Sequence, residues 1–189
     1  MNHLVLYKYF LFLVLLWLTG CAKFNVPPDY ELKNNKQVGL LVMSVNYNTR
    51  SATLHYENMS THENDAIMTS TVHDKIDFNQ PKGRLIVAEL PVGEYQFYKW
   101  HADIDNFEYI SPLFSAQFTI KQGKPVYIGN LNIKAKIIYP FMKVEYEHTI
   151  TDKSERDIAL LKKKYPKLDV TELELQIRKI LPGVILQRK

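Results

Sequence analysis

LIVAELPVGEYQFYKW, residues 85–100, contains two apolar runs separated by Pro91-Val92-Gly93. Short apolar runs bounded by proline and glycine are typical of β-strands. Proline presets φ for the turn, Gly93 takes an unusual backbone angle, and Tyr95 begins an inward face. The stretch therefore predicts two strands joined by a tight turn.

The same period of two extends through residues 37–148 and predicts further strands. Alternating apolar positions occur in 41–47, 52–56, 114–120, 133–137 and 144–148, and residues 67–72 and 126–128 are expected to be further short strands. Turn residues lie at 48–50, 80–83 and 121–124, where Gly123 favours a hairpin. Pro140 marks a break or an edge position. Many short strands at this spacing favour an antiparallel sandwich over βαβ units.

After residue 150 the apolar period becomes helical. Thr151 or Asp152 can cap a first helix, which Pro166 stops. Its apolar stripe is Ile158, Leu161 and Tyr165. Asp169 and Glu172 have capping-box spacing before a second helix. The apolar face of that helix is Leu173, Ile177, Ile180 and Leu181, and Pro182-Gly183 terminates it.

These patterns predict a mainly β fold, an antiparallel β-sandwich of the Ig-like or transthyretin-like kind with a C-terminal pair of helices. The β-sandwich domain occupies residues 37–150 and the helical extension residues 151–189. The final apolar stretch, 184–186, is expected to pack on the sandwich.

The N-terminus carries a targeting signal rather than part of the fold. Lys8 precedes an uninterrupted apolar run, residues 10–18, which is too short to span a bilayer. The run ends in Leu18-Thr19-Gly20-Cys21, which resembles the lipobox of bacterial lipoproteins. An uncleaved anchor or an ordinary buried cysteine are the alternatives.

The lipobox resemblance implies a processing route and a location. Residues 1–20 are then a signal peptide that is cut between Gly20 and Cys21. The Cys21 thiol is diacylglycerylated, and Cys21 becomes an acylated N-terminus. Ala22 is not the aspartate that retains such proteins at the inner membrane, so in a two-membrane bacterium the outer membrane is favoured. Residues 21–36, with Pro27-Pro28, are expected to form the lipidated N-terminus and a flexible tether, extending at most about 50 Å.

A second resemblance supports the fold. Leu90-Pro91-Val92-Gly93-Glu94-Tyr95 is similar to the Leu-Pro-x-Gly-x-Tyr turn of transthyretin-like and carboxypeptidase-regulatory-like sandwiches. Residues 118–131 resemble a hairpin found in small bacterial lipoproteins of unknown function. The resemblance implies a sandwich and brings no catalytic residues.

Composition excludes several classes of protein. The 189 residues are 46% hydrophobic and 23% charged, which excludes a disordered chain and a polytopic membrane protein. The single cysteine excludes a disulfide framework and a multi-cysteine zinc site. A net charge of +4 is too balanced for nucleic-acid binding. Residues 151–189 carry 10 basic and 6 acidic residues, so the positive excess lies there.

No familiar catalytic or metal-binding motif is present. The histidines form no His-x-x-x-His pattern, and no Gly-x-Ser-x-Gly elbow or phosphate loop occurs. His62-Glu63 with His73 would form a metal site only if strands brought them together. Residues 101–108 supply several oxygens but lack the glycine of a calcium loop. The acidic pairs Asp103/Asp105 and Glu145/Glu147 are expected on solvated faces. We expect no metal, no cofactor and no enzymatic activity.

Two groups of side chains are candidates for ligand contact. The aromatic side chains between 95 and 109 exceed what one face of a strand can bury, so some rings are expected to be exposed for sugars or a protein partner. The candidate residues are Tyr98, Trp100, Phe107 and Tyr109. The last turn of the first predicted helix contains Lys162, Lys163 and Lys164. Their charges either interact favourably with the carboxyl end of the helix or contact anionic lipid.

The sequence thus predicts an outer-membrane-anchored lipoprotein on the periplasmic side. Its expected role is that of a non-enzymatic binding or structural module with an envelope protein or glycan as partner. The alternatives are a hydrolase of cell-wall glycan or peptide that uses scattered Asp, Glu or His residues, and a carbohydrate-binding module.

Overall fold

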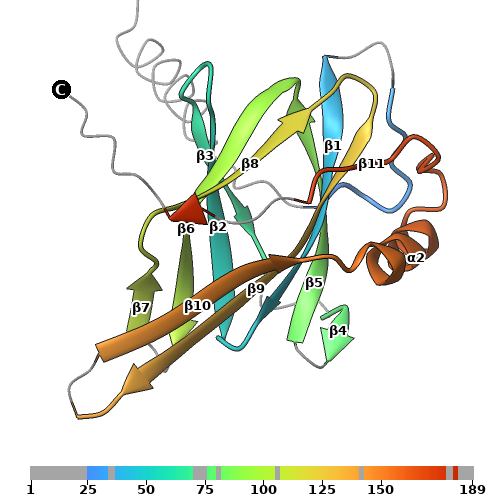
Figure 1. Ribbon diagram of the computed structural model, residues 1–189. Helices are drawn as coiled ribbons and strands as arrows, with labels where there is room; N and C mark the ends of the chain where they lie inside the picture. Colours follow the sequence, from blue (N-terminus) through green and yellow to red (C-terminus); the bar gives the residue numbers. More distant parts are fainter. Residues whose placement is uncertain are drawn as a thin grey trace, which may run out of the picture.

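The computed structural model describes residues 25–33, 37–69, 76–79, 82–104, 107–140 and 143–177, together with the backbone of Leu181 and Pro182. The described chain folds into two facing β-sheets with one short helix at their side (Figure 1). This confirms the predicted mainly β class and the sandwich architecture.

The first sheet is built around β1 (Val38–Tyr47), which pairs with a strand on each side. β1 is antiparallel to β5 (Lys82–Pro91) and parallel to β9 (Pro125–Ile138). β10 (Lys143–Thr151) adds to β9, and the two-residue β4 (Phe78–Asn79) adds to β5. The parallel pairing makes this sheet mixed, whereas the sequence pattern predicted antiparallel strands throughout.

The second sheet is built around β6 (Gly93–Ile104). β6 pairs on one side with β2 (Ser51–Asn58), which carries β3 (Asn64–Met68). On its other side lie β8 (Phe114–Ile120) and, further along, β7 (Phe107–Ile110). The backbone of β12 (Leu181–Pro182) pairs with the start of β8.

Several connections carry the chain from one sheet to the other, including the turn at 48–50 between β1 and β2. The turn between Leu90 and Tyr95 leads from β5 into β6, and the Tyr95 hydroxyl donates to the Pro91 carbonyl oxygen at 2.9 Å. The turn at 121–124 has Gly123 at φ 64°, which suits glycine. It joins β8 to β9, which lie in different sheets, so the hairpin predicted there is instead a crossing.

The main core lies between the sheets and is rich in rings. Trp100 and Phe97 from β6 meet Leu41 and Met43 from β1 within one cluster of buried side chains. A bulge in the β2–β6 pairing falls between His55 and Tyr56. Along β6 the buried positions therefore change from odd to even numbers, so Trp100 points inward.

The opposite face of β1 is also buried, under a third layer. Leu40 and Val42 pack there with Tyr127 of β9 and with Leu161 of the helix. The helix, α2 (Ser154–Lys164), lies on the side of the first sheet away from the second sheet (Figure 1). Residues 25–33 and 165–177 contribute the rest of this outer layer.

The first predicted helix is confirmed as α2, but the second is wrong. Asp169 accepts a hydrogen bond from the Thr171 amide at 2.8 Å in a turn, and the chain then forms β11 (Glu174–Leu175). β11 pairs with Val126–Tyr127 because β10 pairs with β9 only from Asn130 onward, which leaves that part of the β9 edge free. A sheet edge therefore outweighs the local helical pattern. Ile180 lies outside the described residues.

The flexible tether predicted for residues 21–36 is wrong for residues 25–33, which dock on the sheet. The Asn25 side chain bonds to the Leu85 carbonyl oxygen at 3.0 Å and the Val87 amide at 2.9 Å, and the Val26 amide donates to Val87 at 2.8 Å. β4 pairs only with Lys82 and Gly83, so the following backbone groups of β5 need other partners. Residues 21–24 and 34–36 lie outside the described residues.

A buried carboxylate fastens α2 to the first sheet. Asp157 is fully buried and accepts hydrogen bonds from the Ser44 hydroxyl at 2.5 Å and the Tyr127 hydroxyl at 2.7 Å. The Arg156 guanidinium contacts the same carboxylate at 2.8 Å and lies 3.8 Å from the centre of the Phe78 ring. Two strands and the helix therefore meet at the Asp157 carboxylate, and Arg156 extends the contact to β4.

We expect Asp157→Ala to lower the free energy of unfolding by about 3 kcal/mol or more, because it leaves two hydroxyl groups and a guanidinium without their shared acceptor. Glu155→Ala, at an exposed position of the same helix, should change it by less than about 0.5 kcal/mol. Urea unfolding measures both. Equal unfolding midpoints for the two variants would show that the buried carboxylate contributes nothing to stability.

Candidate functional site

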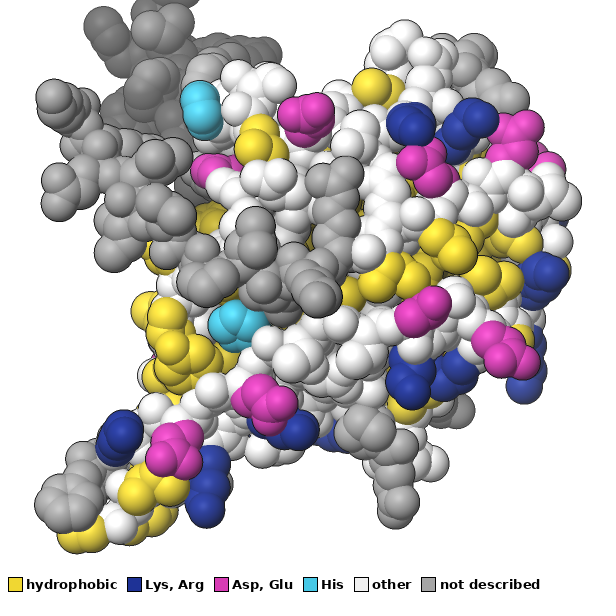
Figure 2. All heavy atoms as spheres, in the orientation of Figure 1, with side chains coloured by type: hydrophobic (Ala, Val, Ile, Leu, Met, Phe, Trp, Pro, Cys, Tyr) yellow, Lys and Arg dark blue, Asp and Glu magenta, His cyan; other side chains and the backbone are white. Residues whose placement is uncertain are grey.

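Exposed hydrophobic side chains gather along one end of the sandwich, over β7 and beside β10. Phe107 and Ile110 of β7 are each 54% exposed, Leu113 before β8 is 45% exposed, and Tyr146 of β10 is 43% exposed. Figure 2 shows this hydrophobic area at the left edge of the molecule. We call these four side chains the β7 surface. Phe107 and Ile110 lie on opposite faces of β7, so the exposed apolar side chains surround this end of the sandwich. Exposed apolar side chains gathered in this way are typical of an interaction site.

A row of rings supports the β7 surface from below and joins the two sheets. The Tyr109 ring lies 5.5 Å from Trp100 and 6.2 Å from Tyr146. The Tyr146 ring lies 6.0 Å from His148, whose ring is 4.7 Å from that of Phe114. Burial lowers the pKa of His148, so its ring is neutral at pH 7. The surface is therefore apolar and rests on packed aromatic side chains.

The structure separates the four predicted aromatic contact residues. Phe107 is exposed, and Tyr109 is half-buried beside it. Trp100 is fully buried in the core, so the prediction that it contacts a ligand is wrong. Tyr98 lies at the β6 bulge, where its ring is 6.2 Å from His55 and the Lys99 ammonium is 5.6 Å from its centre.

The β7 surface contains three residues that the sequence did not single out: Ile110, Leu113 and Tyr146. The detectable signal was that apolar side chains occupy both parities of the stretch 107–113. A half-buried strand alternates, so apolar residues on both parities indicate that part of them is left uncovered. The sequence could not place Tyr146 in this surface, because β10 lies far from β7 along the chain.

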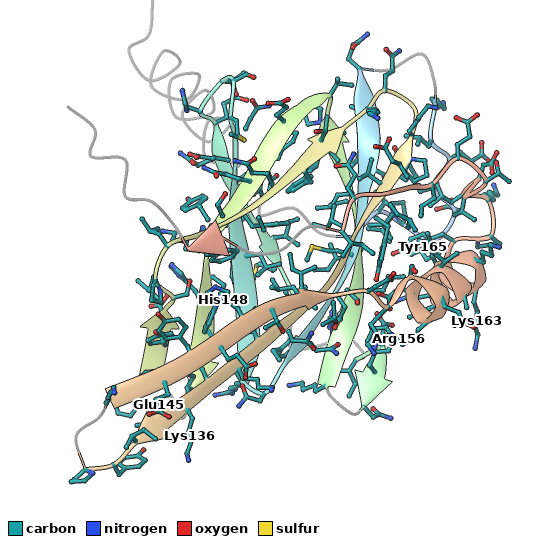
Figure 3. The ribbon with its side chains drawn as sticks, viewed as in Figure 1. Lys136, Glu145, His148, Arg156, Lys163 and Tyr165 are labelled. Carbon is teal, nitrogen blue, oxygen red and sulfur yellow. The ribbon has the colours of Figure 1, made fainter. Side chains whose placement is uncertain are left out.

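The three lysines at the end of α2 do not act alike. Lys164 forms an ion pair with Asp77 at 2.8 Å. Lys162 and Lys163 are exposed, and Figure 3 shows Lys163 at the outer side of the helix. Only two of the three predicted positions therefore offer a charge to an anionic surface, and both also lie at the favourable carboxyl end of the helix.

The described carboxylates named in the sequence lie on polar faces beside basic side chains. Glu145 of β10 lies opposite Lys136 of β9 (Figure 3). Glu147 lies opposite Lys134, and their charged groups are 3.2 Å apart. Asp103 lies 3.7 Å from the Arg50 guanidinium. Asp105 is outside the described residues. This arrangement matches the expected solvated faces of the strands.

Two histidines come together on the outer face of the second sheet. The rings of His55 and His101 lie 4.4 Å apart, and His101 Nδ1 is 3.2 Å from Glu108. His62 lies in the turn between β2 and β3, and His73 is outside the described residues. Among the residues that the structure describes, no group of three or more His, Cys, Asp or Glu side chains is arranged to hold a metal ion.

No protein-family model matches this chain, and no curated protein matches it. Within the described ranges, none of the helical structure is long and apolar enough to cross a membrane. The residues of the lipobox resemblance, including Gly20 and Cys21, lie outside those ranges.

We expect Trp100→Ala to lower the free energy of unfolding by about 3 to 5 kcal/mol, because it empties a large fully buried site. Phe107→Ala should change it by less than about 0.5 kcal/mol, since that ring is mostly in water. Thermal or urea unfolding of the two variants compares them directly. A well-folded Trp100→Ala protein with unaltered stability would contradict the position of Trp100 in the core.

Proposed function

We propose that the protein is a lipid-anchored lipoprotein of the bacterial cell envelope, held at the outer membrane and facing the periplasm, whose sandwich binds another envelope protein without enzymatic activity. Two features support the proposal. Leu18-Thr19-Gly20-Cys21 follows an apolar run of signal-peptide length. The β7 surface offers hydrophobic contact area at one end of the domain.

The docked N-terminal segment sets the distance between anchor and domain. The side chain of Asn25 is hydrogen-bonded to β5, and Asn25 is four Cα–Cα steps along the chain from Cys21. Such a length of chain reaches at most about 14 Å. A lipidated Cys21 would therefore hold the sandwich against the membrane surface, without a long flexible linker between them. Lys162 and Lys163, exposed in the outer layer that residues 25–33 share with α2, could then meet anionic headgroups.

The composition of the β7 surface favours a protein partner over a glycan. Sugar-binding sites stack a ring on an aromatic side chain and surround it with hydrogen-bonding groups. Here the aliphatic Ile110 and Leu113 accompany Phe107 and Tyr146, while Trp100 is buried. Exposed aromatic and aliphatic side chains together are typical of the buried centre of a protein–protein interface.

Anchoring predicts that labelled palmitate is incorporated into the full-length protein and lost in Cys21→Ser. The variant should move from the membrane fraction to the soluble fraction, because the acyl chains supply the membrane affinity. Gel autoradiography and fractionation of cells measure both effects. Unchanged fractionation of Cys21→Ser would contradict the anchor.

Binding predicts that a photo-crosslinking residue at Phe107 forms a discrete adduct in whole cells. The adduct should be lost in Ile110→Asp/Leu113→Asp, since a charge in the centre of an apolar interface is costly. Met68→Asp, at an exposed apolar position on β3, serves as the matched control and should keep the adduct. An adduct that survives Ile110→Asp/Leu113→Asp would show that the partner binds elsewhere.

A further inference from the structure

His55 and His101 are diagonal neighbours on the outer face of the second sheet. In the β2–β6 register, Thr53 lies opposite His101 and His55 lies opposite Lys99. The two rings are 4.4 Å apart and inclined by 46°. This places two imidazoles, the commonest metal ligands in proteins, side by side on rigid strands.

The second ring nitrogens of both histidines lack partners. Within the described part of the chain, Nε2 of His55 and Nε2 of His101 are both buried and without a hydrogen-bond partner. Other buried side-chain atoms, among them Trp100 Nε1 and His148 Nδ1, also lack a partner in the described residues, but the two Nε2 atoms belong to rings that contact each other, so one ion can satisfy both.

Glu108 orients the ring of His101. Its carboxylate lies 3.2 Å from His101 Nδ1, so Nε2 is the ring nitrogen left for another partner. A carboxylate that orients a histidine in this way is the usual outer partner of a metal-ligating imidazole.

Two charged side chains lie beside the histidine pair. Lys99 lies opposite His55 in the β2–β6 register, and Glu108 contacts His101. The charge of Lys99 opposes a bound cation, and the charge of Glu108 offsets it.

We propose that His55 and His101 chelate one late first-row divalent metal ion, copper(II) most tightly, through their Nε2 atoms. An ion that is bound at about 2.0 Å by nitrogen lies about 3.2 Å from a ring centre. Ring centres 4.4 Å apart then subtend roughly 90° at the ion, which is the angle between neighbouring ligands in tetragonal Cu²⁺ or octahedral Ni²⁺ sites. Rotation about χ2 of histidine is soft, so both nitrogens can aim at one point.

The test is a titration of the full-length protein carrying His3→Gln and Cys21→Ser with Cu²⁺ alone, at pH 7 in a non-coordinating buffer. The two substitutions remove the amino-terminal Met1-Asn2-His3 chelate and a thiol that would reduce Cu²⁺. Calorimetry should give one strong site per chain, and electron paramagnetic resonance should show coupling to two imidazole nitrogens. His55→Gln and His101→Gln should each weaken binding at least tenfold. Glu108→Gln should weaken it about tenfold, as expected when the partner of a ligating histidine is lost.

His62→Gln and His148→Gln are the matched controls and should bind Cu²⁺ as the unchanged protein does. Thermal unfolding without metal establishes that each variant is folded. If either His55→Gln or His101→Gln is unfolded, the binding measurement on the other variant tests the proposal. No saturable binding, coupling to a single nitrogen, or full affinity in a folded His55→Gln or His101→Gln protein would overturn the proposal.

Discussion

Both faces of β1 are buried, and this constraint organises the molecule. The side chains on one face fill the space between the sheets. Leu40, Val42 and Ser44 on the other face need a separate layer to cover them. Asp157 secures that cover, because one carboxylate gathers hydroxyl groups from β1 and β9 and the guanidinium next to it in α2. The docked residues 25–33 and the strand β11 complete the same layer. Without it, the central strand of the first sheet would expose an apolar face to water.

Much of this fold could be predicted from the sequence, because a period of two directly reports which side chains share a face. It does not report which strands become neighbours, so the parallel pairing of β1 with β9 and the sheet-crossing turn at Gly123 were missed. The failure at residues 169–181 has a different cause. Asp169, Leu173 and Ile177 have good helical spacing, yet the free edge of β9 provides backbone partners that no local pattern reveals.

In the candidate sites, too, the sequence pattern predicted local features but not contacts between distant strands. Period counting found the aromatic stretch around 95–109 but could not sort its members, because the bulge opposite His55 changes the parity of β6. That single irregularity buries Trp100, leaves Tyr98 on the outer face, and brings His101 next to His55. Residues from distant strands, such as Tyr146 beside Tyr109 or Asp157 beside Ser44, meet only when the sheets form. Their proximity is a property of topology.

The parallel pair of β1 and β9 has a kinetic consequence. Leu40 meets Pro125, so 85 residues separate the two partners along the chain. A ribosome adds about 5 to 20 residues per second, so β1 waits roughly 4 to 17 s for the strand that completes its edge. During this delay a long apolar strand has an open side, and pairings between distant segments also form slowly. Until β9 is available, β1 can pair only with β5, so one of its edges stays without backbone partners.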